Sequence, residues 1–371
     1  MDLDFTDEQQ MLREMARGVC ADFAPLTVVR ELEDDPVGYP AEFWKQLAAL
    51  DLIGLTIPAA YGGSEMTCLE AAILYEELGR SLAPSPHFAS AVIAAGLLVA
   101  AGSEDQKQHW LPQVVSGEAV LTPAWIEPHH GFGPDGVQAT ARPEGDAVVL
   151  DGTKWHVPYA SSATRLVVLA RGAEGVELYL VDPRAEGVTV DQQLTIASDT
   201  QYAVTLHGVR VPVSDRVGGP GSGWEAWAEV MLDGMILLAA LAVGGAQYAL
   251  EITVQYAKDR EQFDKPLGAF QALAHYLADA KTAVDGATLL VHEAAWARAT
   301  DRPVGRLAPM AKLFACQTFR DVTAMAQQIF GGVGFTVEYD IQLYFRRAKQ
   351  LQISWYDSRH LEALVAHEVL D

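Results

Sequence analysis

The spacing of apolar residues changes twice along this 371-residue chain, and that change limits the folds open to it. From about residue 5 to 115 the apolar residues recur at helical spacing, as in Met11, Leu12, Met15 and Val19. From about 117 to 215 the period is two, which is typical of short strands. From about 223 to the end it is helical again. An α–β–α order without βαβ alternation argues against a Rossmann fold.

The pattern predicts an α+β multi-domain protein. The expected domains are an N-terminal helical domain (1–116), a central small β-barrel or sandwich (117–220) and a C-terminal helical bundle (221–371). In the outer zones, helices are expected over 41–50, 68–78, 88–101, 103–111, 224–259, 270–298, 308–329 and 358–369. In the middle zone, strands are expected over 137–141, 147–150, 166–170, 176–181 and 203–211.

The charge balance excludes several classes of partner. The chain has 26 Lys and Arg against 49 Asp and Glu, a formal charge of −23. Such a chain repels nucleic acid and anionic membrane surfaces. The uncharged stretch 234–250 is near the lower length limit for a membrane span, and it is predicted to be a buried helix of a bundle.

The cysteine and histidine patterns predict neither a disulfide framework nor a metal site. Cys20, Cys68 and Cys316 are too few and too scattered for either. His129 and His130 lie in a Gly/Pro-rich loop without nearby ligands. The acidic start of the chain does not look like a signal peptide, so we expect a cytoplasmic protein.

Three features stand out. The third, 126–128 with 152–158 in the β zone, is interpreted on composition alone as a pair of strand edges, and the other two are candidate binding elements. The run 260–267, followed by Phe270 and Gln271, lies between two long helices, where an arginine can hold a pyrophosphate through its planar fork. The run 328–335 contains three glycines, which let a backbone approach a ligand closely. The alternative interpretations are an ordinary interhelical loop and a helix C-cap.

Taken together, these segments resemble the acyl-CoA dehydrogenase family over nearly the whole chain. The resemblance rests on 53–58 with 61–63, 103–107 with 111–112, Lys154 in its strand, 260–267 and 328–334. It implies an N-terminal helical domain, a central β domain and a C-terminal four-helix bundle. It also implies that the protein binds FAD and forms dimers or dimers of dimers.

The resemblance implies that the usual catalytic base is missing. In the family, a glutamate removes the proton alpha to a thioester carbonyl while the flavin takes a hydride from the beta carbon. The two positions that carry this glutamate align with Trp355 and Gly234, and neither an indole nor a glycine accepts a proton. Loss of a general base lowers a rate by about 10²–10⁴-fold. Asp233 and Asp357, each within two residues of those positions, are the fallback candidates.

The flavin-binding positions divide into a lost set and a retained set. Ile126, His156 and Pro158 replace residues that contact a subunit's own flavin ring, and proline has no N–H to donate. The retained set corresponds to residues that hold the ADP half of the neighbouring subunit's FAD, namely Arg260, Phe263, Gln271, Gln328, Gly331 and Gly332. Asp264 departs from this set, because the family usually has glycine there.

Three hypotheses follow. In the first, the chain resembles the degenerate subunit of actinobacterial heteromeric enzymes that shorten steroid side chains, and it pairs in a heterotetramer with a catalytic subunit that binds the acyl-CoA. In the second, it is a complete flavoenzyme with Asp233 or Asp357 as base. In the third, it is a scaffold or acyl-CoA-binding protein without redox chemistry.

Overall fold

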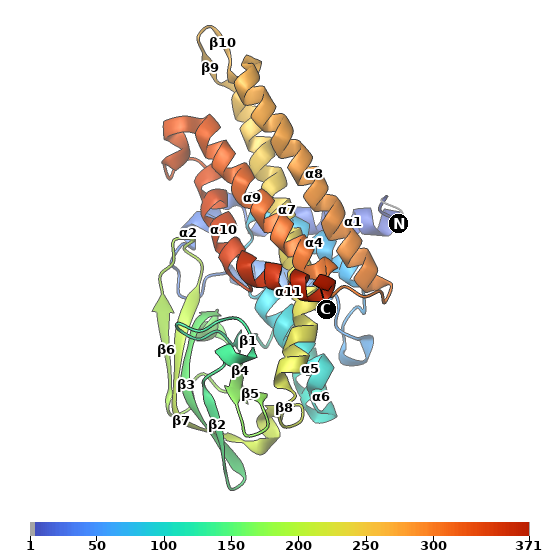
Figure 1. Ribbon diagram of the computed structural model, residues 1–371, viewed down its shortest axis with the longest axis vertical. Coiled ribbons are helices and arrows are strands. Elements are labelled where there is room, and N and C mark those ends of the chain that lie inside the picture. The colour runs from blue at the N-terminus through green and yellow to red at the C-terminus, as the bar shows by residue number, and fades with distance from the viewer. Residues whose placement is uncertain (1–3, 371) are drawn as a thin grey trace. The chain divides into compact units, whose positions relative to one another are not determined.

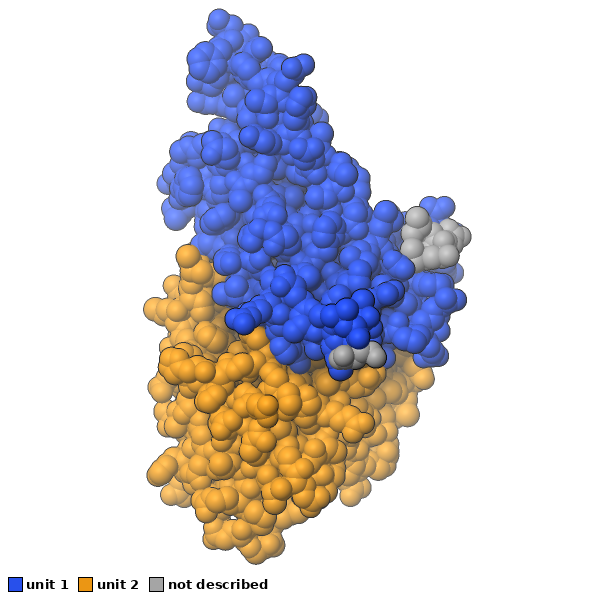
Figure 2. Space-filling model, in the orientation of Figure 1, with its two compact units in different colours: residues 1–29, 67–83, 235–371 blue, residues 30–66, 84–234 orange. Residues whose placement is uncertain are grey.

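The computed structural model describes residues 4–370. The chain forms two units, which Figure 2 shows in different colours. The first combines residues 1–29, 67–83 and 235–371, and the second combines 30–66 and 84–234. The long helix α7 (Gly223–Asp259) begins in the second unit and ends in the first.

The first unit is helical (Figure 1). Helix α9 packs against α8, α10 and α11, and α4 packs against α1 and α8. Besides the end of α7, its helices are α1 (Asp7–Phe23), α4 (Cys68–Ser81), α8 (Gln271–Ala299), α9 (Leu307–Phe330), α10 (Ile341–Ile353) and α11 (Ser358–Leu370). The helix α10 was not among the predicted elements.

Glycines allow α4 and α7 to approach closely within this unit. A Cβ atom on Gly244 would lie 1.8 Å from the carbonyl oxygen of Glu76, and one on Gly79 would lie 2.0 Å from that of Leu241. Helix α7 is the one helix within 4–370 that is long and apolar enough to cross a membrane, and 67% of its most apolar window is buried. This burial is typical of the core helix of a soluble protein, as the sequence predicts for 234–250.

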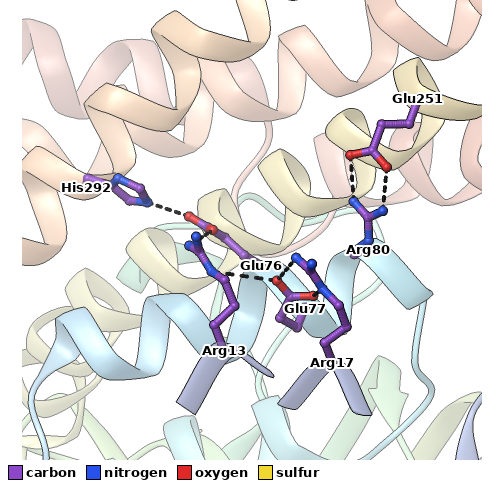
Figure 3. A network of polar contacts seen from close by, with 7 residues as sticks. All are labelled: Arg13, Arg17, Glu76, Glu77, Arg80, Glu251 and His292. Atoms are coloured by element: carbon purple, nitrogen blue, oxygen red, sulfur yellow. Dashed lines mark hydrogen bonds and ion pairs between the residues drawn. The ribbon is translucent and has the colours of Figure 1, made fainter. Parts of the chain in front are cut away.

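A buried ionic network joins α1 to α4 (Figure 3). Glu76 lies between His292 and Arg13. The His292 Nε2 atom is 2.6 Å from one carboxylate oxygen of Glu76, and the Arg13 Nη2 atom is 2.7 Å from the other. Arg17 donates two hydrogen bonds of 2.8 Å to Glu77. Because both glutamates are nearly fully buried, these arginines supply the charge that makes their burial possible.

The second unit combines short helices with a mixed sheet. Its helical segments are the last two residues of α2 (Leu26–Glu31), α3 (Ala41–Ala49), the π-helix η2 (Phe88–Ala94), α5 (Ala95–Ala101) and α6 (Glu104–Val115), with the first part of α7. The predicted helix over 88–101 therefore begins as a π-helix. Ser103 forms the expected capping box with Gln106 at the start of α6.

The sheet has eight strands in the order β6-β7-β3-β2-β4-β5-β8, with β1 paired to β4. Buried Val, Leu and Ala side chains from most of these strands form its core. The predicted strands are present, but β1, β6 and β8 were missed. The bounds are β1 Leu121–Ala124, β2 Thr140–Glu144, β3 Ala147–Pro158, β4 Arg165–Arg171, β5 Val176–Val181, β6 Val188–Gln193, β7 Gln201–Pro212 and β8 Arg216–Val217.

Candidate functional site

The first candidate element is a hairpin at the free end of the α7–α8 pair (Figure 1). Its strands are β9 (Glu261–Gln262) and β10 (Lys265–Pro266), joined by a two-residue turn of Phe263 and Asp264. Arg260, which precedes β9, is exposed and makes no ion pair within residues 4–370. An unpaired, exposed guanidinium is suited to bind a phosphate group.

The second candidate element is the glycine turn that follows α9. A Cβ atom on Gly331 or Gly332 would meet nothing within 4 Å. Gly331 needs glycine for its φ of +65°, whereas Gly332 has an ordinary φ. Neither backbone strain nor packing within the chain therefore explains glycine at 332. A glycine at this position would permit close approach by a ligand or another chain.

An aromatic stack joins these two elements. Tyr256, one helical turn before Arg260, stacks on Phe330 with ring centroids 4.2 Å apart, and Phe330 directly precedes Gly331. Sequence reasoning missed Tyr256, although its spacing of four from Arg260 is a helical signal. Gln271 at the start of α8 and Gln328 in the last turn of α9 are both exposed. The structure thus joins the predicted ADP-binding segments within one unit.

The segments 126–128 and 152–158 of the β domain contain Glu127 and Lys154, which have a structural role. The Lys154 ammonium lies 2.6 Å from a Glu127 carboxylate oxygen, and both side chains are buried. The same carboxylate accepts hydrogen bonds from the backbone N–H groups of Gln138 and Ala139. Burial lowers the pKa of Lys154 to about 8, although its attraction to Glu127 opposes the shift. These residues hold three parts of the β domain together.

The positions that correspond to the flavin-ring contacts supply few donors. Pro158 has no N–H, and its carbonyl oxygen accepts a 2.7 Å hydrogen bond from Thr122. The Ile126 carbonyl accepts from the backbone N–H of Trp155 at 2.9 Å. His156 is exposed, with φ of +54°, and its Nδ1 atom lies 2.8 Å from Gln201 Oε1. These residues do not fit the family's way of holding its own flavin ring.

A side chain at Gly234, one of the two predicted base positions, would crowd apolar neighbours. Gly234 is buried in α7, and a Cβ atom there would lie 3.0 Å from Ile93 and 3.4 Å from Phe88. A glutamate side chain would need these apolar groups to move. The neighbouring Asp233 is half-buried on the same helix.

The second base position lies in a tightly held loop between α10 and α11. Trp355 and Tyr356 both have left-handed backbones, with φ of +54° and +79°. The Lys312 ammonium is fully buried and donates to the carbonyl oxygens of Ser354 and Tyr356 at 3.0 Å and 2.8 Å. Burial lowers the pKa of Lys312. Sequence reasoning missed this lysine, because its carbonyl partners leave no pattern in side chains.

Asp357 has a structural role in this loop. Its carboxylate accepts a 2.9 Å hydrogen bond from the backbone N–H of His360 and so caps the start of α11. Asp357 lies in the first unit and Asp233 in the second. No group of three or more metal-ligating side chains occurs in the described chain, and Cys20, Cys68 and Cys316 form no disulfide within residues 4–370.

Comparison with known sequences decides the family. Residues 6–118, 123–208 and 221–354 match the N-terminal, middle and C-terminal domains of acyl-CoA dehydrogenases. The chain belongs to the acyl-CoA dehydrogenase family. A probable acyl-CoA dehydrogenase of Bacillus subtilis, YngJ, is 32% identical over 383 aligned residues that cover 100% of both chains.

Solved structures of acyl-CoA dehydrogenases have the same fold. The chain superposes on a subunit of the ChsE4-ChsE5 complex of Mycobacterium tuberculosis with a TM-score of 0.91, at 28% identity, covering 100% of this chain and 99% of that one. The steroid acyl-CoA dehydrogenase Tcur3481-Tcur3483 gives 0.88 at 32% identity, with 98% and 99% covered. The predicted helical, β and helical domains of this family are confirmed. Its members are FAD-binding oxidoreductases.

Proposed function

We propose that this chain is the non-catalytic subunit of a heteromeric FAD-dependent acyl-CoA dehydrogenase. In this proposal it contributes Arg260, Phe263, Gln271 and the segment 328–332 to the ADP half of a FAD held mainly by a catalytic partner. The complex would be a heterotetramer. Bound flavin supplies the hydride acceptor in this family, and the partner would supply the base.

The observation that carries the proposal is the contrast between the ADP-binding positions and the base positions. Most residues of the ADP-binding set are exposed, and at Gly332 the set contains a glycine that the chain's own packing does not require. The base positions hold Gly234, which apolar groups enclose, and Trp355, which has no proton-accepting group. A chain of this kind is suited to complete a partner's site and unsuited to run its own.

The proposed substrate is the CoA thioester of a steroid side chain. The proposed location is the cytoplasm. The steroid acyl-CoA dehydrogenase among the similar structures supports the substrate class. The similar ChsE4-ChsE5 structure is a complex of two differently named proteins, which supports pairing with an unlike subunit. The lack of a disulfide among the three cysteines in residues 4–370 is consistent with a reducing compartment.

The first test is the visible absorption spectrum of the chain purified alone and of the chain co-expressed with acyl-CoA dehydrogenase subunits encoded beside it. The proposal predicts a colourless chain and a yellow complex that oxidises a CoA thioester. A yellow chain with about one flavin per polypeptide would refute the proposal and favour the homomeric enzyme. In that case Asp233→Asn and Asp357→Asn would test the two fallback bases. A colourless complex would favour the scaffold hypothesis.

A matched pair of glycine variants tests the contributed site. Gly332→Ala meets no neighbour within 4 Å, so it should leave the chain's own stability unchanged and lower FAD retention in the complex. Gly334→Ala would bring a Cβ to 3.0 Å from the Phe330 Cβ, which cannot swing away as the Gln327 amide can, and should destabilise the chain itself. Equal FAD retention by Gly332→Ala and wild-type complexes would count against a close approach at this turn.

A further inference from the structure

An irregularity in β3 sets the direction of the His156 side chain. The pairing of β3 with β7 shifts register between Lys154 and Val157, as in a β-bulge. His156 lies within this shift and has a left-handed backbone, with φ of +54°. Its backbone N–H donates to Gln193 Oε1 at 2.8 Å, and its side chain is exposed. Bulges beside functional sites often redirect a side chain in this way.

A chain of hydrogen bonds fixes the position of the proton on the His156 ring. Gln201 Nε2 donates to a carboxylate oxygen of Asp199 at 2.6 Å. Because a carboxylate only accepts hydrogen bonds, the amide oxygen of Gln201 is the atom that faces His156, 2.8 Å from its Nδ1. The Nδ1 atom therefore carries the proton. In the neutral ring, Nε2 is then an acceptor.

This arrangement differs from that of the chain's buried histidines. The rings of His87 and His292 also hold hydrogen bonds, but their side chains are mostly buried. Bonds of that kind satisfy polar groups that water does not reach. Water can satisfy both nitrogens of an exposed ring in either tautomer. At His156 the buried Gln201 selects one tautomer and leaves an acceptor on an exposed ring.

The neighbouring rings indicate the shape of a ligand for this acceptor. The half-buried Trp155 indole lies between two imidazoles, with its centroid 5.8 Å from that of His129 and 6.1 Å from that of His156. Ring groups at such separations make favourable contacts, so another flat ring can pack here. The formal charge of −23 disfavours an anion. Pro158, in the same stretch, has no N–H to offer an acceptor group.

We propose that Trp155 and His156 form a binding site for an uncharged, planar ring compound that carries an O–H or N–H donor. The His156 Nε2 atom accepts the hydrogen bond from that donor. Asp199 and Gln201 are positioning residues, because they set the tautomer of His156 without touching the ligand. None of these residues belongs to the ADP-binding set, so the site does not depend on the proposed function.

The first measurement is the tautomer of His156, from long-range ¹H–¹⁵N NMR of the full chain labelled at histidine. We expect the proton on Nδ1. Asp199→Asn should release this preference, because an asparagine amide donates as well as accepts and no longer holds Gln201 in one orientation. A proton on Nε2 in the wild-type chain would overturn the inference.

The second measurement compares two probes, 2-naphthol and 2-methoxynaphthalene, which differ in the O–H donor. By titration with the chain alone and in the co-expressed complex, 2-naphthol should bind about two- to tenfold tighter, the effect of one neutral hydrogen bond. His156→Asn should remove this difference. The matched control is His129→Asn, which should keep it. Histidine and asparagine both tolerate positive φ, and His129, at +65°, contacts the same indole.

Four results of the titrations would overturn the inference. Equal affinities for the two probes, or no binding of either, would mean that Nε2 accepts no ligand donor. Equal effects of the two variants would mean that the probes only contact the rings. A lower thermal midpoint for His156→Asn with an unchanged probe preference would mean that His156 only satisfies Gln201. Binding to the chain alone but not to the complex would mean that a partner covers the site.

Discussion

The ionic network of Figure 3 makes an asymmetric prediction about stability. Removing one partner of a buried ion pair costs about 3–5 kcal/mol, whereas exposed pairs contribute about 0.2–1 kcal/mol. The Glu77 side chain is 4% exposed and the Arg17 side chain 53% exposed. The cost therefore depends on which partner is removed.

Glu77→Gln leaves an arginine that can turn toward water, and Arg13 keeps its bond to Glu76. We expect a loss of about 2 kcal/mol, between the buried and exposed limits. Arg17→Met leaves the buried Glu77 carboxylate with only Arg13, whose Nε atom is 3.8 Å away. We expect that loss to be larger, about 3 kcal/mol.

The assay is hydrogen exchange of the α1 and α4 amides together with the urea midpoint of unfolding. The matched control is Asp285→Asn, which removes an exposed pair with Lys281 on α8 and should change stability by less than about 0.5 kcal/mol. Because the Glu77 side of the Arg17–Glu77 ion pair is buried, the loss of stability should persist in 0.5 M salt. Equal losses for Glu77→Gln and Arg17→Met, or losses as small as the control's, would refute the reasoning.

Three further predictions concern buried groups. Burial lowers the pKa of His87 to about 4, so between pH 6.5 and 4 the unfolded state binds a proton that the native state does not. Stability should fall by up to about 3 kcal/mol as the pH falls through this window, and His87→Gln should flatten that limb in pH-dependent urea titrations. Lys312→Met should speed hydrogen exchange of the amides of residues 354–361, because the hydrogen bonds from the ammonium to the Ser354 and Tyr356 carbonyls are lost. Unchanged exchange would mean that the loop keeps its structure without Lys312. Gly244→Ala should destabilise the chain by at least about 2 kcal/mol, since its Cβ would lie 1.8 Å from a backbone oxygen, and a thermal midpoint equal to wild type would show that α4 and α7 can separate.

Much of the fold could be predicted because its helices and strands carry strong periodicity. The capping box at Ser103 and the strand 176–181 follow from local residues alone. The strand β1 was missed because Leu121–Ala124 is short and buried throughout, so it shows no alternation. The helix α10 was missed although Ile341, Tyr344, Ala348 and Leu351 recur at helical spacing on its buried face.

The candidate site could be predicted in part from its residue types. A glycine turn and an arginine at the end of a helix indicate ligand contact from the sequence, and the family resemblance assigns them to FAD. The sequence could not reveal the Tyr256–Phe330 stack that joins them, because the two rings are far apart along the chain. It also could not show that Asp357, a candidate base, caps the start of α11, because a cap depends on backbone geometry.

The sequence by itself determined the order of helical and β zones and the family. These depend on residue identity and spacing, which are local properties of the chain. Only the tertiary structure decided which glycines are required by the chain's own packing, because that depends on atoms distant in sequence. A Cβ atom on Gly244 would lie 1.8 Å from a backbone oxygen, whereas a Cβ atom on Gly332 would meet nothing within 4 Å. That difference in surroundings, invisible in the letters, separates a packing glycine from a candidate binding glycine.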